Sequence, residues 1–102
     1  MNKKTYAIQY LQTAQRDLLE IIDYIKLDNP TAAKSFAGKI DEHISNLSHF
    51  PKTGKIPNDE RLKKLGYRIL PIDNYLVFYV IIGQTVQIRR IIHGARRYKF
   101  LL

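Results

Sequence analysis

Eight consecutive uncharged residues, YLVFYVII from Tyr75 to Ile82, constrain the fold of this chain more than any other stretch. A strand with one face in water alternates apolar and polar residues, and this run does not alternate. The run is also far shorter than the ~18 residues of a membrane-spanning helix. It therefore predicts a central β-strand that other parts of the chain cover, at least in part, on both faces.

Turn signals on both sides of this run define the neighbouring strands. Asp73-Asn74 and Gly83-Gln84 are typical of tight turns, so strands are expected at Tyr67–Ile72 and Thr85–Ile92. Pro71 has no N–H to donate, which places the earlier of these strands at an edge of the sheet or at a bulge. The sequence thus predicts three successive antiparallel strands.

The last of these strands is expected to contain a bulge. Val86 and Ile88 point inward by alternation, but the pattern fails at Arg89-Arg90. One additional residue at that point would place Ile91 in the core and turn Arg90 outward.

The first half of the chain predicts a short strand at 6–10 and then two helices. Apolar residues recur every three or four positions in two stripes. These stripes are Ala14, Leu18, Ile21, Ile22 and Ile25, and then Ala33, Phe36, Ala37, Ile40, Ile44 and Leu47. Because the connection between the stripes is short, the helices are expected to form an antiparallel hairpin.

Capping residues mark the start of both helices. Thr13 is expected to cap the first helix, with Asp17 in its first turn and on its solvent-facing side. Asn29 is a favourable N-cap for the second helix, and Pro30 suits its first position.

The expected fold is α+β with the order β-α-α-β-β-β, in one domain that spans residues 1–102. The antiparallel helical hairpin packs on a mostly antiparallel four-stranded sheet. A basic segment, 52–66, joins the two layers, and Asn58 is expected to cap one helical turn within it, from Asp59 to Leu65. Loops of this length are often functional.

The net charge of +8 lies entirely in the second half of the chain. Residues 1–50 hold six Lys or Arg and six Asp or Glu, whereas residues 51–102 hold eleven and three. This asymmetry favours a polyanionic partner, either a nucleic acid or an acidic protein, and the alternative is a generally basic soluble surface. The chain has no cysteine, no apolar segment after its two N-terminal lysines and no membrane-length run, so we expect a cytoplasmic protein with no membrane association.

The residues also limit the possible chemistry. His43, His49 and His93 are too scattered in the sequence to suggest a metal site, and no cofactor-binding motif is present, so we expect neither a metal nor a cofactor. A set of basic and aromatic side chains instead gathers on the sheet and near the C-terminus. These candidates for contacts with a target or a nucleic acid are Arg68, Arg89, Arg90, Arg96, Arg97 and Lys99, together with Lys63 and Lys64 in the basic segment.

Some of these residues are of the types that metal-free cleavage of RNA requires. Arginine binds phosphate with a planar fork, tyrosine stacks on an unpaired base, and histidine exchanges a proton near neutral pH. The catalytic candidates are Arg68, His93, Arg96 and Tyr98. A protein that binds nucleic acid without catalysis uses the same residue types, so this observation alone leaves both activities open.

Over nearly its whole length the chain resembles the toxins of the RelE/ParE superfamily, from bacterial type II toxin–antitoxin modules. The resemblance is carried by AQRDLLEIIDYI in the first helix, by NPTAAKSFAGKIDEHISNLSHFPKTG across the second, and by GYRILPIDNYLVFYVI and VQIRRIIHGARRY over the sheet. It implies the same β-α-α-β-β-β fold. It also implies a small acidic antitoxin as partner, in a hetero-oligomer.

The superfamily has two branches with different targets. RelE-like members cleave mRNA on the ribosome through basic residues on central strands and near the C-terminus, whereas ParE-like members are associated with inhibition of DNA gyrase. In the resemblance, Arg68 falls in the basic region of the first sheet hairpin, Arg96 falls near the C-terminal phosphate-binding arginine of RelE-like enzymes, and Tyr98 lies where an aromatic residue often follows. The uncharged run from Tyr75 and the HGAR stretch resemble the ParE-like branch more closely, although Arg97 stands where ParE-like chains often have an acid.

The sequence therefore leads to three hypotheses. The first is a ParE-like toxin of a plasmid-stabilization module, which inhibits growth by binding an essential target such as gyrase. The second is a RelE-like, metal-independent mRNA endoribonuclease, and the third is a non-toxic basic module that binds nucleic acid. In each case Phe100, Leu101 and Leu102 are expected to dock on the fold and to fix the basic segment 93–99 beside Arg68.

Overall fold

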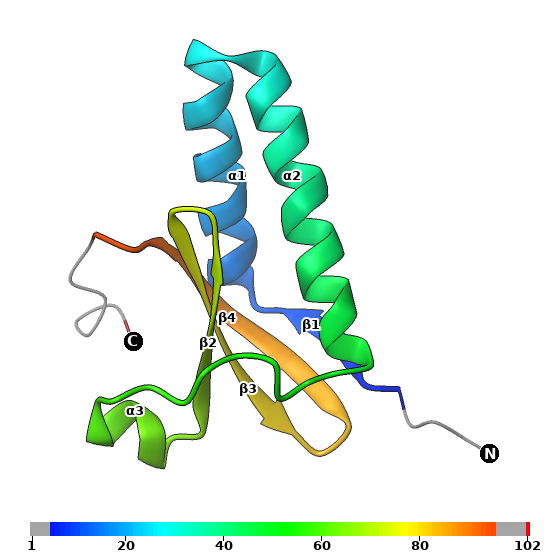
Figure 1. Ribbon diagram of the computed structural model, residues 1–102, viewed down its shortest axis with the longest axis vertical. Helices are drawn as coiled ribbons and strands as arrows, with labels where there is room; N and C mark the ends of the chain where they lie inside the picture. The colour runs from blue at the N-terminus through cyan, green and yellow to red at the C-terminus, as the bar shows by residue number, and fades with distance from the viewer. Residues whose placement is uncertain (1–4, 96–101) are drawn as a thin grey trace.

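A helical hairpin and a four-stranded sheet make up most of the structure, a computed structural model that describes residues 5–95 and 102 (Figure 1). The elements in chain order are β1 Ala7–Tyr10, α1 Gln12–Asp28, α2 Pro30–Ser45, the 3-10 turn η1 Asn46–Ser48, α3 Glu60–Lys64, β2 Tyr67–Ile72, β3 Tyr75–Ile82 and β4 Thr85–His93. The strands lie in the order β1-β4-β3-β2, with β1 parallel to β4 and the other neighbours antiparallel. The predicted α+β fold is confirmed. No helix in the described part has the length and apolar character to cross a membrane.

Both faces of β3 are buried, as its uncharged sequence predicts. Val77 and Tyr79 lie in the main core under α2, whereas Phe78 and Val80 lie in a second cluster on the opposite face. Successive side chains of a strand point to opposite faces, so two covered faces require apolar residues at every position. Val80 is the most exposed of the four, and it retains only 4% of its surface.

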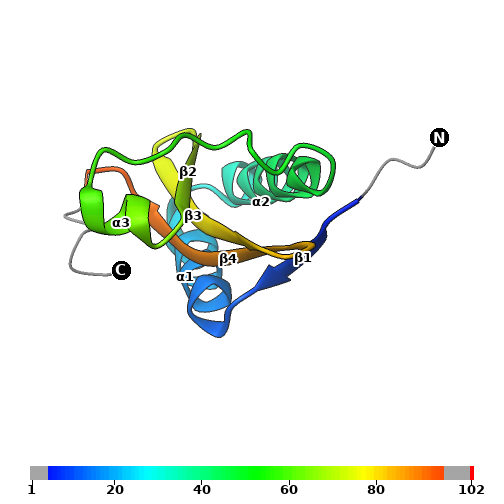
Figure 2. The same ribbon diagram turned by 90° about the horizontal axis from the view of Figure 1, so that it is seen from below.

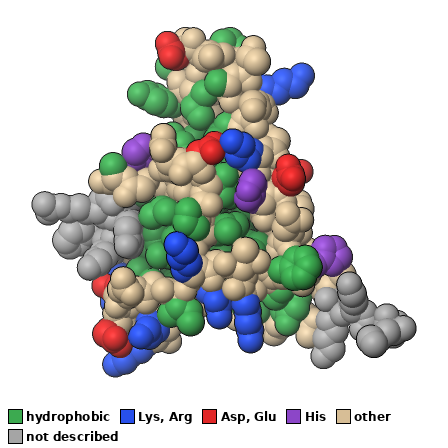
Figure 3. All heavy atoms as spheres, viewed as in Figure 1, with side chains coloured by type: hydrophobic (Ala, Val, Ile, Leu, Met, Phe, Trp, Pro, Cys, Tyr) green, Lys and Arg blue, Asp and Glu red, His purple; other side chains and the backbone are tan. Residues whose placement is uncertain are grey.

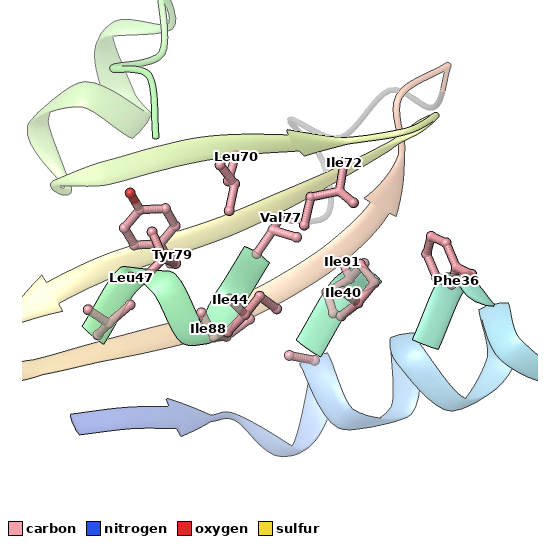
Figure 4. Close-up of a cluster of buried hydrophobic side chains, with 12 residues drawn as sticks. Phe36, Ile40, Ile44, Leu47, Leu70, Ile72, Val77, Tyr79, Ile88 and Ile91 are labelled. Atoms are coloured by element: carbon pink, nitrogen blue, oxygen red, sulfur yellow. The ribbon is translucent and has the colours of Figure 1, made fainter. Parts of the chain in front are cut away.

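The helix α2 contributes most of the helical part of the main core and lies over one face of the sheet (Figure 2, Figure 4). Phe36, Ile40 and Ile44 recur every four residues and project from one side of α2 onto the strands. At the start of the helix, the Asn29 side chain accepts a hydrogen bond from an amide of the first turn, and Pro30 is the first helical residue. Both of these predictions are confirmed.

The helix α1 continues along the edge of β4 where the short strand β1 ends. The Thr13 hydroxyl donates to the Arg89 carbonyl at 3.0 Å, and Asp17 accepts from the amide of Ile91, which is buried as predicted. The side chains of Thr13 and Asp17 thus bond to the backbone of β4, and the two predictions that placed them at the start of α1 are wrong. Thr13 does not cap α1, whose N-cap is Leu11 without a side-chain bond, and Asp17 lies beyond the first turn and faces the sheet.

The predicted bulge is present in β4. The pairing of β3 with β4 slips between Phe78 and Tyr79, which leaves Arg89 as the additional residue. Arg90 was expected to turn outward into solvent, and this expectation is wrong. Its side chain is only 22% exposed and is paired with Asp17. The carboxylate of α1 holds the guanidinium against the fold.

The second face of the sheet is covered by α3 and by Leu102. Leu62 of α3 is fully buried beside Tyr67, and Leu102 packs against the same cluster, as predicted for that residue. The N-cap of α3 is Asp59, whose carboxylate accepts from the Leu62 amide at 2.9 Å, so the prediction of Asn58 as the cap is wrong by one residue.

The outer edge of β2 is protected by a backbone bridge and by a proline. The amide and carbonyl of Ile69 bond to Lys55, each at 2.8 Å, so the backbone groups of Ile69 point away from β3. Pro71, two residues further, has the same orientation, and its missing N–H therefore costs the sheet no hydrogen bond. β2 is an edge strand, as this proline predicts.

Candidate functional site

The sheet separates the predicted basic side chains onto two faces. Arg68 alternates with Tyr67, which belongs to the cluster beneath α3, so Arg68 points to the opposite face, that of α2. Arg89 lies over the ring of Tyr67, with 5.6 Å from its guanidinium carbon to the ring centroid. Arg90 is paired across the strands with Phe78, of the same cluster. Arg89 and Arg90 therefore share the face of α3, and Arg68 does not.

Arg68 holds the loop that follows η1. Its Nη1 donates to the carbonyl of Gly54 at 2.8 Å and to that of Lys52 at 3.3 Å. We call residues 49–56 the 49–56 loop; it passes in front of the sheet on its way to α3 (Figure 1). The guanidinium is thus partly engaged by backbone carbonyls, which accept its hydrogen bonds but do not neutralise its charge.

The hydroxyl of Tyr79, a fully buried residue of β3, also shapes this loop. It donates to the Pro51 carbonyl at 2.7 Å and accepts from the Gly54 amide at 2.8 Å. Burial raises the pKa of Tyr79, and the Gly54 amide and Arg68 partly offset that rise. A Cβ at Gly54 would lie 2.6 Å from the Tyr79 Oη, so only glycine fits this contact.

On the opposite face, Arg89 borders a shallow hollow of about 210 Å³ lined by Leu11, Thr13, Tyr67, Arg89, Arg90 and Leu102. The Arg89 Nε donates to the Gln87 side chain at 2.9 Å, and no acid pairs with Arg89 in the described part of the chain. Its charge is therefore available to a partner.

Arg90 differs from Arg89 because it is neutralised within the fold. Its Nε and Nη2 donate to the two carboxylate oxygens of Asp17 at 2.7 and 3.0 Å. This hydrogen bonding raises the pKa of Arg90 against the opposing effect of burial. A paired, half-buried guanidinium attracts a polyanion less than an unpaired one does.

His93 lies at the far end of the sheet from Arg68. Its ring meets the ring of Tyr75 edge-on with 5.2 Å between centroids, and its Nδ1 accepts from the Ala95 amide. Arg68 on β2 is paired with Tyr79 and His93 on β4 with Tyr75, four residues apart on β3, so the two backbone positions are offset by about 13 Å along the strands and also lie on opposite sides of β3. Val77, which lies between these two positions on β3, is fully buried in the main core, so the two side chains do not converge on one phosphate.

The remaining candidates lie on α3 or outside the described residues. Lys63 approaches Glu60 at 3.8 Å, an exposed pair of little energetic weight, and Lys64 is exposed on the same helix. The other predicted contact and docking residues, which the structure does not describe, are Arg96, Arg97, Tyr98, Lys99, Phe100 and Leu101. Among residues 5–95 and 102, no three His, Asp or Glu side chains gather closely enough to hold a metal ion.

Sequence reasoning marked the basic segment that contains most of the 49–56 loop as a functional candidate, but it did not identify the loop itself as a distinct surface. It presents the exposed side chains of Phe50, Lys52 and Lys55 beside Arg68. On the face drawn in Figure 3, Lys and Arg side chains stand beside exposed hydrophobic ones in the lower half of the molecule. The combination of Pro, Gly and Lys in FPKTGK indicated a basic turn, but the contacts that fix it come from residues remote in sequence.

Comparison with known proteins places this fold in a family. The sequence model of the family described as ParE toxin of type II toxin-antitoxin system, parDE, matches residues 8–98. Among solved structures, a chain of the chromosomal ParDE toxin–antitoxin system from P. aeruginosa is similar with a TM-score of 0.74 and 20% identity, over 88% of this chain and 97% of that one. A chain of the RelBE2 toxin–antitoxin complex from Mycobacterium tuberculosis is similar with a TM-score of 0.62 and 25% identity, over 87% and 98%. No curated protein matches the chain. Because the family model covers most of the sequence, this chain belongs to the ParE toxins of type II toxin–antitoxin systems.

Proposed function

We propose that this protein inhibits growth by binding an essential protein target, DNA gyrase, and that it does so without catalysis. The observation that carries the proposal is the separation of Arg68, His93 and Arg89 by the sheet and its core. Cleavage of RNA through the 2′-hydroxyl needs a base, an acid and a cation around one phosphate. The described residues do not provide that arrangement, which favours the gyrase-directed activity implied by resemblance to the ParE-like branch.

The proposed contacts are cations without an acid partner. Among the predicted contacts, Arg68, Arg89 and Lys64 meet this condition in the described part, and Arg96, Arg97 and Lys99 are included on their sequence alone. An Arg96→Ala variant that folds is expected to lose growth arrest. Continued arrest by that variant would count against the contact role of Arg96.

The proposed partner that neutralises the toxin is an acidic antitoxin. Support comes from the family and from the structural neighbours, which belong to toxin–antitoxin complexes. The chain's own charge of +8 favours a partner of opposite sign.

A supercoiling assay tests the proposed target. Adding the purified full chain to gyrase and relaxed plasmid is expected to abolish supercoiling, and adding the cognate antitoxin is expected to restore it. Unchanged supercoiling at saturating toxin would overturn the proposal.

Two further assays separate the alternatives. New 5′ ends on translated mRNA after induction, mapped by primer extension, would favour the RelE-like endoribonuclease, for which the similarity to the RelBE2 chain is the supporting observation. Normal growth on expression without the antitoxin would favour the non-toxic nucleic-acid-binding module.

A further inference from the structure

The 49–56 loop is held in one conformation by contacts with three residues of the strands β2 and β3. Tyr79 bonds to it at two points, Arg68 at two more, and Ile69 at a two-way backbone bridge. Within the loop, the Phe50 carbonyl accepts from the amide and the hydroxyl of Thr53, at 3.2 and 2.7 Å. The loop is therefore preorganised, so a ligand that binds it meets a small entropic cost of ordering.

Protection of the β2 edge explains only part of this arrangement. Covering an edge strand requires the backbone bridge between Lys55 and Ile69, but it does not require particular side chains on the outer side of the loop. The outer side carries Phe50, which is 67% exposed, and Ile56, which is 56% exposed. An exposed aromatic ring on a rigid loop calls for a different explanation.

The charged side chains of the 49–56 loop itself are all basic. Lys52 and Lys55 are exposed and have no ion-pair partner among the described residues, and Arg68 bonds only to carbonyls there. Between residues 43 and 58 the sequence has no acid. The ring of His49 lies 6.4 Å from that of Phe50, tilted by 58°, so both aromatic rings stand at the start of a cationic segment.

We propose that the 49–56 loop is a binding surface for single-stranded nucleic acid. An unpaired base stacks on the open ring of Phe50, and the adjoining phosphates bind Lys52, Lys55 and the free side of Arg68. This combination of an aromatic platform and a cationic track is the one that single-stranded nucleic acids require, and it tolerates any base sequence. An acidic protein partner matches the cations equally well, but it gains less from an isolated ring than from a continuous apolar groove. The surface does not include Arg89 or the C-terminal basic residues, and the proposal holds whether or not gyrase is the target.

Fluorescence anisotropy of the purified full chain with labelled oligo(dT) and oligo(U) tests the stacking role. Phe50→Ala is expected to weaken binding about tenfold, within the range measured when one stacking side chain is removed. Tyr24→Ala is the matched control, because Tyr24 is an aromatic residue 73% exposed on α1, away from the loop. It is expected to leave the Kd unchanged.

The salt dependence of the same binding tests the cationic role. Each phosphate contact to a single strand contributes about 0.7 to the slope of log Kd against log salt, so a Lys52→Ala/Lys55→Ala variant is expected to lower that slope by about 1.4. Lys26→Ala/Lys34→Ala removes the same charge from the exposed hairpin and is expected to leave the slope unaltered.

Three results would overturn the proposal. One is wild-type affinity in the Phe50→Ala variant, and another is an equal loss of slope in the two lysine pairs, which would indicate only nonspecific attraction. The third is weakened binding of the antitoxin by Phe50→Ala with unchanged binding of the oligonucleotides, since this would assign the loop to the antitoxin. All six substitutions lie at exposed positions, and the hydrogen bonds that hold the loop do not involve their side chains.

Discussion

Asp17 is the residue that joins α1 to the bulged part of β4. Its carboxylate accepts hydrogen bonds from the Arg90 Nε at 2.7 Å, from the Arg90 Nη2 at 3.0 Å and from the Ile91 amide at 3.0 Å. The side chain is only 13% exposed, so solvent screens these bonds weakly. The bulge places the Ile91 amide and the Arg90 guanidinium on the same edge of β4. Both are hydrogen-bond donors, and the Asp17 carboxylate accepts from both.

We predict that Asp17→Ala destabilises the protein by about 3 kcal/mol, because it leaves a half-buried cation and an amide without their acceptor. Asp17→Asn keeps an acceptor for the Ile91 amide and is expected to cost about half as much. Urea denaturation measures both, with Glu20→Ala, an exposed acid of the same helix, as the control. Equal stabilities of the Asp17→Ala and Glu20→Ala variants would contradict this role.

Tyr10 makes stability depend on pH in the alkaline range. Burial, and to a smaller extent the negative charge of Asp41, raise the pKa of Tyr10 to about 12. The unfolded chain ionises this phenol near its ordinary pKa of about 10. A raised pKa means that the folded state favours the neutral form, so the contribution to stability is complete below pH ~10 and is lost as the pH rises to about 12.

We therefore predict that the free energy of unfolding falls between pH ~10 and pH ~12, and that Tyr10→Phe removes part of this fall. At neutral pH the variant is expected to match the wild type. Tyr24→Phe, at an exposed tyrosine, controls for the loss of a hydroxyl. Parallel pH profiles for the wild type and Tyr10→Phe would show that this phenol does not contribute.

At the scale of the elements, the conformation of the 49–56 loop depends on the hydroxyl of Tyr79, a residue of β3. Tyr79→Phe deletes the hydroxyl that serves both the Pro51 carbonyl and the buried Gly54 amide. We expect a loss of about 2 kcal/mol, the cost of unsatisfied buried polar groups. Hydrogen exchange of the Gly54 amide should accelerate more than that of amides in α2. Uniform acceleration across the molecule would indicate that the loop is not held locally by this hydroxyl.

The start of α2 depends on a local contact instead. The Asn29 Oδ1 accepts from the Ala32 amide at 3.1 Å, and Asn29→Ala is expected to cost about 1 kcal/mol in thermal or urea unfolding. Asn58 is a matched control because it precedes α3 but does not cap it. Asn58→Ala should be neutral, and equal losses in both variants would contradict the assignment of the cap.

At the scale of the whole molecule, the asymmetric charge should govern association with the antitoxin. All of the +8 excess lies in residues 51–102. We predict that the association rate falls about tenfold or more between low and high salt, whereas the dissociation rate changes less. Stopped-flow mixing measures both rates. Lys63→Glu/Lys64→Glu should slow association more than Lys26→Glu/Lys34→Glu, and the reverse order would place the antitoxin on the hairpin.

The fold was predictable from sequence because its signals are local. The turn pairs around Tyr75–Ile82, the apolar stripes of the hairpin, the Asn29 cap and the failed alternation at Arg89 each act within a few residues. The errors are also instructive. Thr13 and Asp17 are residue types typical of a helix start, but in the fold they bond to backbone groups of β4. The neighbouring sequence gives no indication of these contacts. Both Asn58 and Asp59 are good N-caps, so the sequence alone does not distinguish them. The packing of Leu62 selects the residue at which α3 begins, and Asp59 is therefore the cap.

The candidate site was less predictable than the fold. The sequence by itself determined which residue types are available, that the positive charge is concentrated in the second half, and that one strand is buried on both faces. Only the tertiary structure decided which cations share a surface. Alternation along β2 and the bulge in β4 place Arg68 and Arg89 on opposite faces, and pairing with Asp17 neutralises Arg90. Tyr79, Arg68 and Ile69 fix the loop that presents Phe50. These outcomes depend on contacts between residues far apart in the chain, and no periodicity in the sequence encodes such contacts.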